Sequence, residues 1–352
     1  MRIMNFAEKR VFVGLSGGVD SAVSAALLAQ AGAIVTGVFI NGWYPEGMPC
    51  TWREDRRDAM RIAARLHIPF LTLDASEAYK KSVIDYLIRE YAAGRTPNPD
   101  VMCNRDVKFG VFHRFAKERG ASRIATGHYA SIRLDETPRA HLLRGTDHAK
   151  DQSYFLWAVP ERTLRDVIFP VGNLRKEAVR GLARRFHLPV ANKKDSQGIC
   201  FLGPVSVEDF LRHEIGTVPG IAQNEEGAAV GRHDGAVLYT IGERVPLQGA
   251  TGPWYVVRKD IPANTLVVVR KPRRMTGLSR IRFSDANWIG TSVPGETVEA
   301  EYRYHGPRVL GTLGEDGMSF IPNGTLPETP AEGQSLVLYR GTECIGGGII
   351  GA

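Results

Sequence analysis

A glycine-rich loop near the N-terminus has the composition of a phosphate-binding loop. It lies between the apolar run Val11–Leu15 and a helix pattern, and it reads Gly14-Leu15-Ser16-Gly17-Gly18-Val19-Asp20-Ser21. Small residues let backbone N–H groups approach a phosphate, and the start of a helix adds positive potential. Asp20 stands where a Walker A loop has its lysine, and GxGxxG spacing is absent, so two familiar nucleotide loops are excluded.

Cys103 follows a segment that contains two prolines, Pro97 and Pro99. The prolines predict a shaped loop here rather than a strand or a helix. A helix is expected to begin just after Cys103, and its N-terminus and nearby cations would favour the thiolate. Asp100 is close enough in sequence to act as a general acid or base. A lone cysteine is more often a small buried apolar residue, so the segment alone leaves both interpretations open.

Cys200 ends a second polar segment, which reads Lys193-Lys194-Asp195-Ser196-Gln197-Gly198-Ile199-Cys200. The two lysines would favour a thiolate here as well. A solvated surface loop is the plain alternative for a segment of this composition. The two cysteines together are therefore a hypothesis about sulfur chemistry that needs support from the rest of the chain.

Two short polar motifs come after predicted strands or turns. Residues 127–129 (Gly-His-Tyr) follow a strand, so they should lie at the carboxyl edge of a parallel sheet, where ligands gather. His128 can equally be a hydrogen-bonded structural histidine. Residues 150–152 (Lys-Asp-Gln) precede three aromatic residues that are more typical of a core than of an RNA-stacking surface, namely Tyr154, Phe155 and Trp157.

The first 200 residues alternate between strand and helix patterns. Strands are expected at Val11–Leu15, Ile34–Ile40, Phe70–Leu73 and Ile124–Thr126. Helices are expected after the glycine-rich loop, at Arg53–Leu66, at Ser76–Ala92 and around Val111–Lys117. This order predicts an α/β domain with a parallel sheet covered by helices on both faces.

The pattern changes after Cys200. A short helix around Val207–Leu211 is followed by short strands with Gly and Pro turns, which are expected at Val237–Ile241, Trp254–Arg258, Leu266–Arg270, Ser335–Tyr339 and Cys344–Ile350. They predict one or two small all-β modules. The expected domains are residues 1–202, a central β domain at 203–275 and a C-terminal barrel-like domain at 276–352.

The overall composition sets limits on the class of protein. The formal net charge is +7 and the pI is about 9.3, which fits a polyanionic partner such as RNA and equally a solvated basic surface. The four cysteines are far apart, so a disulfide scaffold, structural zinc and an iron–sulfur cluster are not expected. We also expect no signal peptide and no membrane span, and hence a cytoplasmic protein.

Taken together, these segments resemble the tRNA-specific 2-thiouridylase family over essentially the whole chain. The glycine-rich loop resembles the PP-loop of enzymes that cleave ATP between its α- and β-phosphates. The more specific matches are the Thr-Pro-Asn-Pro-Asp segment before Cys103 and the Asp-Ser-Gln-Gly-Ile-Cys segment at Cys200. The resemblance continues into Tyr239–Arg244, Trp254–Val257 and Cys344–Ile349.

The resemblance implies a reaction at wobble uridine 34 of tRNA. ATP, with Mg²⁺, adenylates O2 of the base, and a sulfur-relay protein or cysteine desulfurase loads Cys200 with a persulfide. Cys103 then releases the sulfur or resolves a disulfide, and Asp100 assists. The implied ATP-binding residues are Gly14 to Ser21, Ile40 and Gly127. The implied tRNA-binding residues are Asn98, Pro99, Asp100, His128, Lys150, Asp151, Gln152, Arg303, Tyr304 and Gln334.

Two positions depart from the family pattern. Glu243 stands where the family usually has Gln, which adds a negative charge to a module expected near tRNA. Ile40 stands where the family usually has Met against the adenine, and an apolar side chain is kept there. The first departure places a negative charge where the resemblance implies an RNA contact, whereas the second keeps the apolar contact expected for ATP.

Two other functions are compatible with parts of the sequence. One is a different PP-loop ligase of the amide or argininosuccinate type, which would need no pair of reactive cysteines. The other is an RNA-binding protein with a decayed nucleotide loop, against which the intact Ser16, Asp20 and Ser21 argue.

Overall fold

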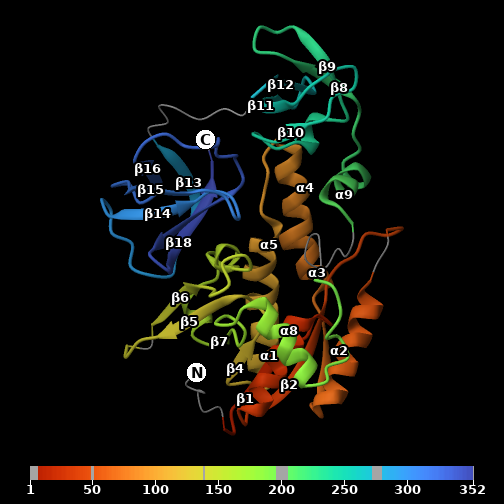
Figure 1. The fold of residues 1–352 in the computed structure, drawn as a ribbon, viewed down its shortest axis with the longest axis vertical. Coiled ribbons are helices and arrows are strands. Elements are labelled where there is room, and N and C mark those ends of the chain that lie inside the picture. Colours follow the sequence, from red (N-terminus) through yellow and green to blue (C-terminus); the bar gives the residue numbers. More distant parts are fainter. Residues whose placement is uncertain (1–6, 49–50, 138, 196–204, 272–279, 352) are drawn as a thin grey trace.

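The computed structural model of the chain describes residues 7–48, 51–137, 139–195, 205–271 and 280–351. These residues form three β-sheets (Figure 1). Cys50 and Cys200 lie outside the described residues, so the expected approach of Cys103 and Cys200 stays a prediction.

A parallel sheet forms the centre of the N-terminal part. Its strands are, in spatial order, β3 (Phe70–Asp74), β2 (Ile34–Asn41), β1 (Arg10–Gly14), β4 (Arg123–Ala125) and β7 (Val167–Ile168). Each pair of neighbours is parallel. The expected strands and the parallel arrangement are therefore confirmed.

Helices cover both faces of this sheet, because successive side chains of a strand point to opposite faces. Val11 and Val13 of β1 pack in one core cluster with residues of α1 (Val19–Gln30), α2 (Trp52–Leu66) and α8 (Lys176–Arg185). Phe12 packs in a second cluster on the other face. The doubly covered α/β sheet is as predicted.

Two helices on the second face have a π-helical stretch along their length. The first consists of α3 (Ser76–Tyr79), η1 (Lys80–Ile84) and α4 (Asp85–Ala92), which confirms the expected helix. The second consists of α5 (Pro99–Met102), η2 (Cys103–Val111) and α6 (Phe112–Glu118). The expectation of a loop up to Cys103 is wrong from Pro99 onward, because proline fits the first helical turn, where its missing N–H has no partner to lose.

The central β part follows α9 (Val207–Glu214) and contains a five-stranded sheet. Its strands are, in spatial order, β10 (Arg244–Val245), β11 (Trp254–Asp260), β12 (Thr265–Val269), β8 (Gly220–Gln223) and β9 (Ala229–His233). The strand expected at Val237–Ile241 is wrong, since this segment holds the short helix η4 (Ala236–Leu238) and a turn. There the Thr240 N–H donates to the Glu243 carboxylate at 2.8 Å, a side-chain bond that replaces a partner strand.

The C-terminal part contains a closed ring of six antiparallel strands. They are β13 (Ile281–Trp288), β16 (Ser319–Pro322), β15 (Arg308–Leu313), β14 (Thr297–Glu301), β17 (Ser335–Arg340) and β18 (Glu343–Ile350). Because β18 pairs back with β13, the ring closes into a barrel. In β17, Leu336 and Leu338 face the barrel core, whereas Val337 and Tyr339 pack in the core cluster of the N-terminal part.

A hairpin from the N-terminal half extends the barrel sheet. It consists of β5 (Ala130–Leu134) and β6 (Ala140–Arg144), and β6 pairs with β18 at Leu142↔Cys344 and Leu143↔Glu343. The buried Arg144 guanidinium donates to Glu301 at 2.7 Å and lies over the Tyr339 ring. This one sheet therefore combines segments from two of the expected domains, residues 1–202 and 276–352. Two short helices follow, η3 (Ser153–Leu156) and α7 (Glu161–Leu164).

Candidate active site

The glycine-rich loop connects the end of β1 to the start of α1, as a phosphate-binding loop requires. The Ser16 N–H donates to Ser21 Oγ at 3.2 Å, and Ser21 Oγ donates to the Gly18 carbonyl at 3.1 Å. Gly17 has φ +76°, and a Cβ there would collide with the backbone of Asp55. The loop is therefore held in one shape by its own serines, and glycine is required at its turn.

Gly127, at the carboxyl end of β4, lies directly against the same loop. A Cβ on Gly127 would be 2.6 Å from the backbone nitrogen of Ser21. Ile40, at the end of β2, is buried, and the nearby Leu15 N–H donates to the Val38 carbonyl at 2.8 Å. The implied ATP-binding residues therefore meet at the carboxyl ends of β1, β2 and β4, where an open α/β sheet binds its ligands.

Asp20 of the loop is held by two donors from distant parts of the chain. Lys176 Nζ lies 2.7 Å and 2.8 Å from the two carboxylate oxygens, and the Tyr129 hydroxyl donates to one of them at 2.8 Å. Burial and the Asp20 charge raise the pKa of Tyr129, which keeps its hydroxyl protonated as a donor. The negative charge of Asp20 is thus matched by Lys176 from the start of α8.

Asp195 gathers three cations beside this ion pair. Lys150 and Arg180 bind its carboxylate at 2.8 Å and 2.7 Å, and Lys176 reaches it at 2.9 Å. Burial acts to raise the pKa of Asp195, but the hydrogen bonds from Lys150 and Lys176 outweigh it and lower the pKa to about 2. The segment that leads toward Cys200 is therefore anchored next to the nucleotide loop.

Lys193 ties the same segment to the loop from another side. Its Nζ donates to the Gly17 carbonyl at 3.1 Å and binds Asp55 and Asp58, each at 2.8 Å. Lys193 was expected to favour a cysteine thiolate. In the structure its charge is matched by two carboxylates, and it supports the turn at Gly17.

Cys103 lies inside a helix and is fully buried. It is the first residue of η2, one turn after the helix begins at Pro99. Arg105, one of the nearby cations in the sequence that were expected to favour the thiolate, pairs with Asp106 at 2.9 Å. The position keeps the favourable helix N-terminus but adds burial, which opposes ionisation of a thiol.

The helix that carries Cys103 packs against the end of β4. The ring of Phe109 lies 5.7 Å from that of His128, and the Asn104 side chain donates to the Phe155 carbonyl at 3.0 Å. His128 is buried and bonded to Thr126 Oγ1 at 2.7 Å. Burial, with the Lys108 charge, lowers the pKa of His128 well below its usual value, so its imidazole is neutral near pH 7.

Asn98 connects the start of the Cys103 helix to the C-terminal barrel. Its Oδ1 accepts from the Ser335 N–H at 2.7 Å, and its Nδ2 donates to Gln334 Oε1 at 3.2 Å. Gln334 in turn donates to the Thr96 carbonyl at 2.8 Å. Two residues implied in tRNA binding, Asn98 and Gln334, therefore bind each other.

Tyr304 belongs to an aromatic group beside this junction. Its ring lies 4.3 Å from that of Phe155 and stacks on His305 at 4.0 Å. Burial and the charges of Asp151 and Asp100 raise the pKa of Tyr304 to about 12. Tyr304 and Asp100 are therefore close enough to interact, although they come from different parts of the fold. Its neighbour Arg303 pairs with Glu328 at 3.1 Å on a more exposed edge.

Residues 150–152 are used largely within the protein. Asp151 is buried and accepts from the N–H groups of Gly145 and Ser153, and Gln152 accepts from the Tyr129 N–H at 3.0 Å. The side chain of Lys150 is 40% exposed. Its ammonium group is paired with Asp195 at 2.8 Å. Tyr154 and Trp157 are buried, which confirms their expected place in the core.

Glu243, one of the two departures from the family pattern, faces its own turn. Its carboxylate accepts from the Thr240 N–H and lies near Lys259. Burial lowers the pKa of Lys259 to about 8, and the Glu243 charge partly opposes this shift. The additional negative charge is thus partly matched inside the central β part.

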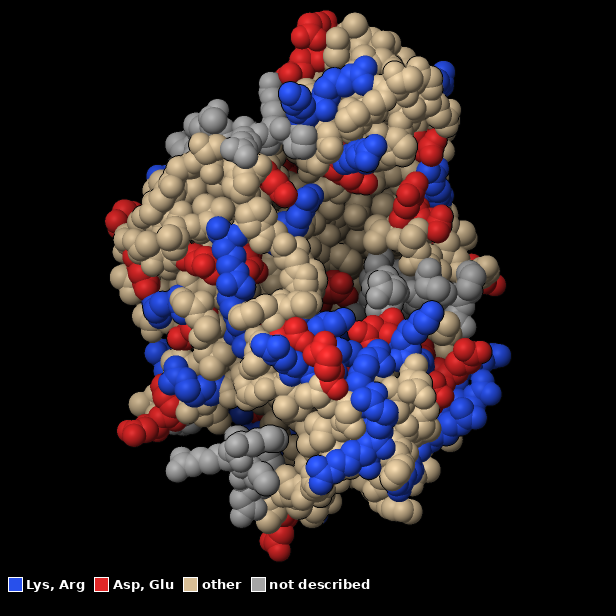
Figure 2. Space-filling view, in the orientation of Figure 1, with Lys and Arg blue, Asp and Glu red and all other residues tan. Residues whose placement is uncertain are grey.

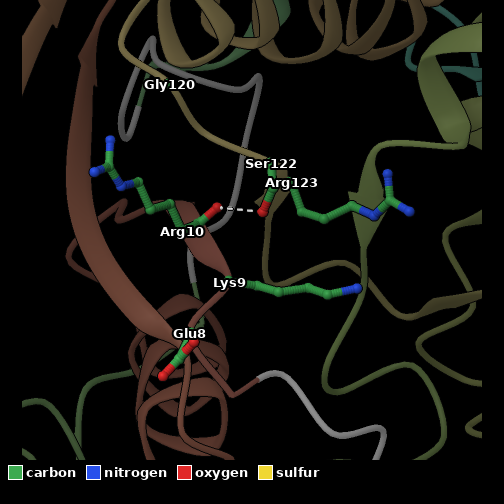
Figure 3. A pocket seen from close by; sticks show the side chains of 6 residues that line it. All are labelled: Glu8, Lys9, Arg10, Gly120, Ser122 and Arg123. Carbon is green, nitrogen blue, oxygen red and sulfur yellow. Dashed lines mark hydrogen bonds between the residues drawn. The ribbon is translucent and has the colours of Figure 1, made fainter.

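The surface around the site is hollowed and edged by basic side chains. Figure 2 shows Lys and Arg side chains, with Asp and Glu among them, on the N-terminal part of this face, below a hollow that lies between the two β parts. A different cavity of about 410 Å³, lined by Arg10 and Arg123 among others, lies at the amino ends of β1 and β4 (Figure 3). The nucleotide loop lies at the opposite, carboxyl ends of these strands, so this cavity takes no part in the site.

Lys176, Asp195 and Tyr129 are site residues that sequence reasoning did not single out. Tyr129 stands next to His128 in a motif of interest, and Asp195 in the Cys200 segment, but neither was given a role. Lys176 carries no local signal, since it lies 156 residues from its partner Asp20. Among the described residues, no helix is long and apolar enough to cross a membrane, and no three potential ligand side chains gather around a metal position.

Comparison with known proteins identifies the family. Residues 9–204 match the model described as a tRNA methyl transferase HUP domain, residues 208–270 a PRC-barrel domain of the same name, and residues 326–350 an aminomethyltransferase beta-barrel domain. The first model's name refers to methyl transfer. The relatives that match along the whole chain are instead named for thiolation.

Three such relatives are tRNA-specific 2-thiouridylases. The protein from Stenotrophomonas maltophilia (strain K279a) is 43% identical, and the match covers 97% of this chain and 93% of that protein. The second thiouridylase of Geobacillus kaustophilus (strain HTA426) is 40% identical over 97% and 95%. The one from Enterococcus faecalis (strain ATCC 700802 / V583) is 38% identical over 98% and 96%. On this sequence identity along the whole chain, the protein belongs to the tRNA-specific 2-thiouridylase family.

Proposed function

We propose that this protein replaces O2 of wobble uridine 34 in tRNA with sulfur, at the expense of ATP. The observation that carries the proposal is the packing of Phe109, on the Cys103 helix, against His128 at the end of β4. The residue before His128, Gly127, touches the nucleotide loop. The helix that carries the buried Cys103 and the nucleotide-type loop therefore meet at the carboxyl end of β4. A reaction that uses both ATP and a cysteine requires the two to lie together.

The first half of the reaction activates the base. O2 of the uridine attacks the α-phosphorus of ATP, and pyrophosphate leaves with the electrons of the broken bond. Backbone N–H groups of residues 16–21 would bind the phosphates. Mg²⁺ would accompany ATP and neutralise phosphate charge. Asp20 is the acidic side chain in the loop whose oxygens fit that ion.

The second half delivers sulfur. A persulfide on Cys200, loaded by a sulfur-relay protein or a cysteine desulfurase, supplies the sulfur that attacks C2, and AMP leaves with the original O2. Cys103 either attacks the persulfide to release hydrosulfide or resolves the intermediate, and both routes leave a disulfide with Cys200 that a cellular thiol must reduce. The neutral imidazole of His128 suits contact with an uncharged base. The cytoplasm, where thiols stay reduced, is the proposed compartment.

The two β parts and the basic rim would hold the anticodon arm. Arg303, Tyr304 and Lys150 have side chains directed toward solvent or partly exposed, and they are the proposed tRNA contacts. Asn98, Pro99, Asp100 and Gln334 form the junction against which the target base would rest. An anticodon loop can present an unstacked uridine at low cost.

The test is mass spectrometry of tRNA nucleosides after incubation with the protein, ATP, Mg²⁺ and a persulfide source. We expect 2-thiouridine, AMP and pyrophosphate, with none of the three formed beyond background when Gly17→Val replaces the wild type. Formation of AMP with an amide or other ligation product, and no sulfur in tRNA, would instead identify a ligase of the same fold.

A further inference from the structure

Lys176 occupies a position in the nucleotide site that the sequence motifs do not account for. Its side chain is 10% exposed, and its Nζ lies within 2.9 Å of carboxylate oxygens on both Asp20 and Asp195. Its backbone N–H, at the start of α8, donates to Asp147 at 2.9 Å. Lys176 is therefore fixed both at its backbone N–H and at its ammonium group, and the ammonium group lies against the loop.

The loop itself has no cation to bind phosphate. A Walker-type loop has a lysine where this loop has Asp20, and Asp20 stands in the first turn of α1, the position at which phosphates approach. An unmatched carboxylate at this point would repel ATP. A positive charge beside Asp20 reduces this repulsion, and Lys176 is the cation in contact with Asp20.

The three neighbouring cations have other partners. Lys193 binds Asp55, Asp58 and the Gly17 carbonyl, so it supports the turn. Lys150 and Arg180 bind Asp195. Among these four side chains, Lys176 is the one that binds the Asp20 carboxylate of the loop, and its second partner, Asp195, lets it move without losing every contact.

We propose that Lys176 is the phosphate-binding cation of the site, and that its ammonium group transfers from Asp20 to the β- and γ-phosphates when ATP enters. Asp195 retains its contact during this exchange, which leaves Asp20 available to the ion that accompanies the nucleotide. The proposal rests on the proposed function only in taking ATP as a substrate.

The test measures ligand affinity by calorimetry, without tRNA, using ATP, AMP and pyrophosphate as separate probes. For Lys176→Met we expect ATP and pyrophosphate affinity to fall at least tenfold, about 1.4 kcal/mol. AMP affinity should change less than threefold, because AMP lacks the β- and γ-phosphates. Lys176→Arg should recover part of the loss. Arg184→Met removes an exposed cation from the same helix and should bind all three probes like the wild type.

The same substitution in an Asp20→Asn variant separates direct binding of phosphate by Lys176 from simple neutralisation of Asp20. If Lys176 binds phosphate, Lys176→Met should still lose ATP affinity tenfold when combined with Asp20→Asn. If it only neutralises Asp20, the loss should vanish in that background, and the proposal is overturned. Equal losses for AMP and ATP would overturn it too, since they indicate a damaged fold. A wild type that binds ATP but makes no thiouridine would refute the proposed function and leave the assignment of Lys176 standing.

Discussion

Asn98 and Gln334 are 236 residues apart in sequence, and their side-chain amides share a hydrogen bond of 3.2 Å. Asn98 immediately precedes the helix that carries Cys103, and Gln334 immediately precedes strand β17 of the barrel. The barrel is thus bonded directly to the start of the cysteine helix. Binding of RNA to the barrel and placement of the base beside Cys103 are expected to depend on the same contact.

The first prediction follows from this hydrogen bond. Gln334→Ala should weaken tRNA binding about five- to tenfold and leave ATP affinity unchanged, because the hydrogen bonds of its side-chain amide go to Asn98 and Thr96 and not to the nucleotide loop. Asn98→Ala should do the same, with some loss of stability, since it leaves the Ser335 N–H without its acceptor.

The tRNA affinity of the double variant, Asn98→Ala with Gln334→Ala, is the decisive measurement. If the two residues act through one contact, the effects on tRNA affinity should be clearly less than additive. Independent, fully additive effects would show that the hydrogen bond is incidental. Point variants are preferable to a truncation before Ile281, because removing β13–β18 would uncover the paired edge of β6.

The second prediction concerns Gly127. Gly127→Ala places a methyl group against the backbone of Asp20 and Ser21, so β4 and the nucleotide loop must separate. We expect the KM for ATP to rise at least tenfold while tRNA affinity is kept. Gly181→Ala, where a Cβ would meet nothing within 4 Å, is the matched control and should behave like the wild type. A normal KM for Gly127→Ala would remove Gly127 from the ATP site.

The third prediction distinguishes the cysteines. Cys103→Ser should still accept a persulfide on Cys200 and should make no 2-thiouridine, whereas Cys200→Ser should accept none. Cys344→Ala should remain active, because burial raises the pKa of Cys344 to about 12 and keeps it a thiol. The measurement is persulfide labelling together with thiouridine formation. Wild-type turnover by Cys103→Ser would exclude a mechanism that uses two cysteines.

The fourth prediction is a pH dependence of stability. Because the pKa of His128 is lowered in the folded protein, the unfolded chain binds more protons below about pH 6.5, so folding stability falls as pH falls. In His128→Gln this contribution is absent. When the pH is lowered from 7.5 to 5.5, the free energy of unfolding of the wild type should therefore fall by about 1 kcal/mol relative to that of His128→Gln.

Urea unfolding at both pH values checks this prediction. His148→Gln replaces an exposed histidine and should follow the wild type. A constant difference between the wild type and His128→Gln would mean that His128 ionises equally well in the folded and unfolded chain.

The parallel sheet and the loop could be predicted from the sequence because their signals are local. Short β-branched runs, amphipathic helix patterns and small residues between Val13 and Ala22 need only neighbouring residues to be recognised. The start of the helix at Pro99 was missed because proline breaks most helices and fits only the first turn.

Other features depend on contacts across the whole chain. Lys176 finds Asp20 only once α8 is packed beside α1, and nothing near residue 176 indicates this partner. The strand predicted at Val237–Ile241 failed because one side chain, Glu243, satisfies the backbone locally. The hairpin at Ala130–Arg144 was not predicted at all, since its sheet partner lies about 200 residues further on.

That last pairing has a consequence for synthesis on the ribosome. The edge of β6 stays open until β18 has been made, roughly 200 residues later, which takes about 10–40 s at typical elongation rates. During this interval the nascent chain carries an unpaired strand next to a nearly finished nucleotide site. Chaperone binding to this edge, and aggregation of chains stalled before β18, are therefore expected at this stage of biogenesis.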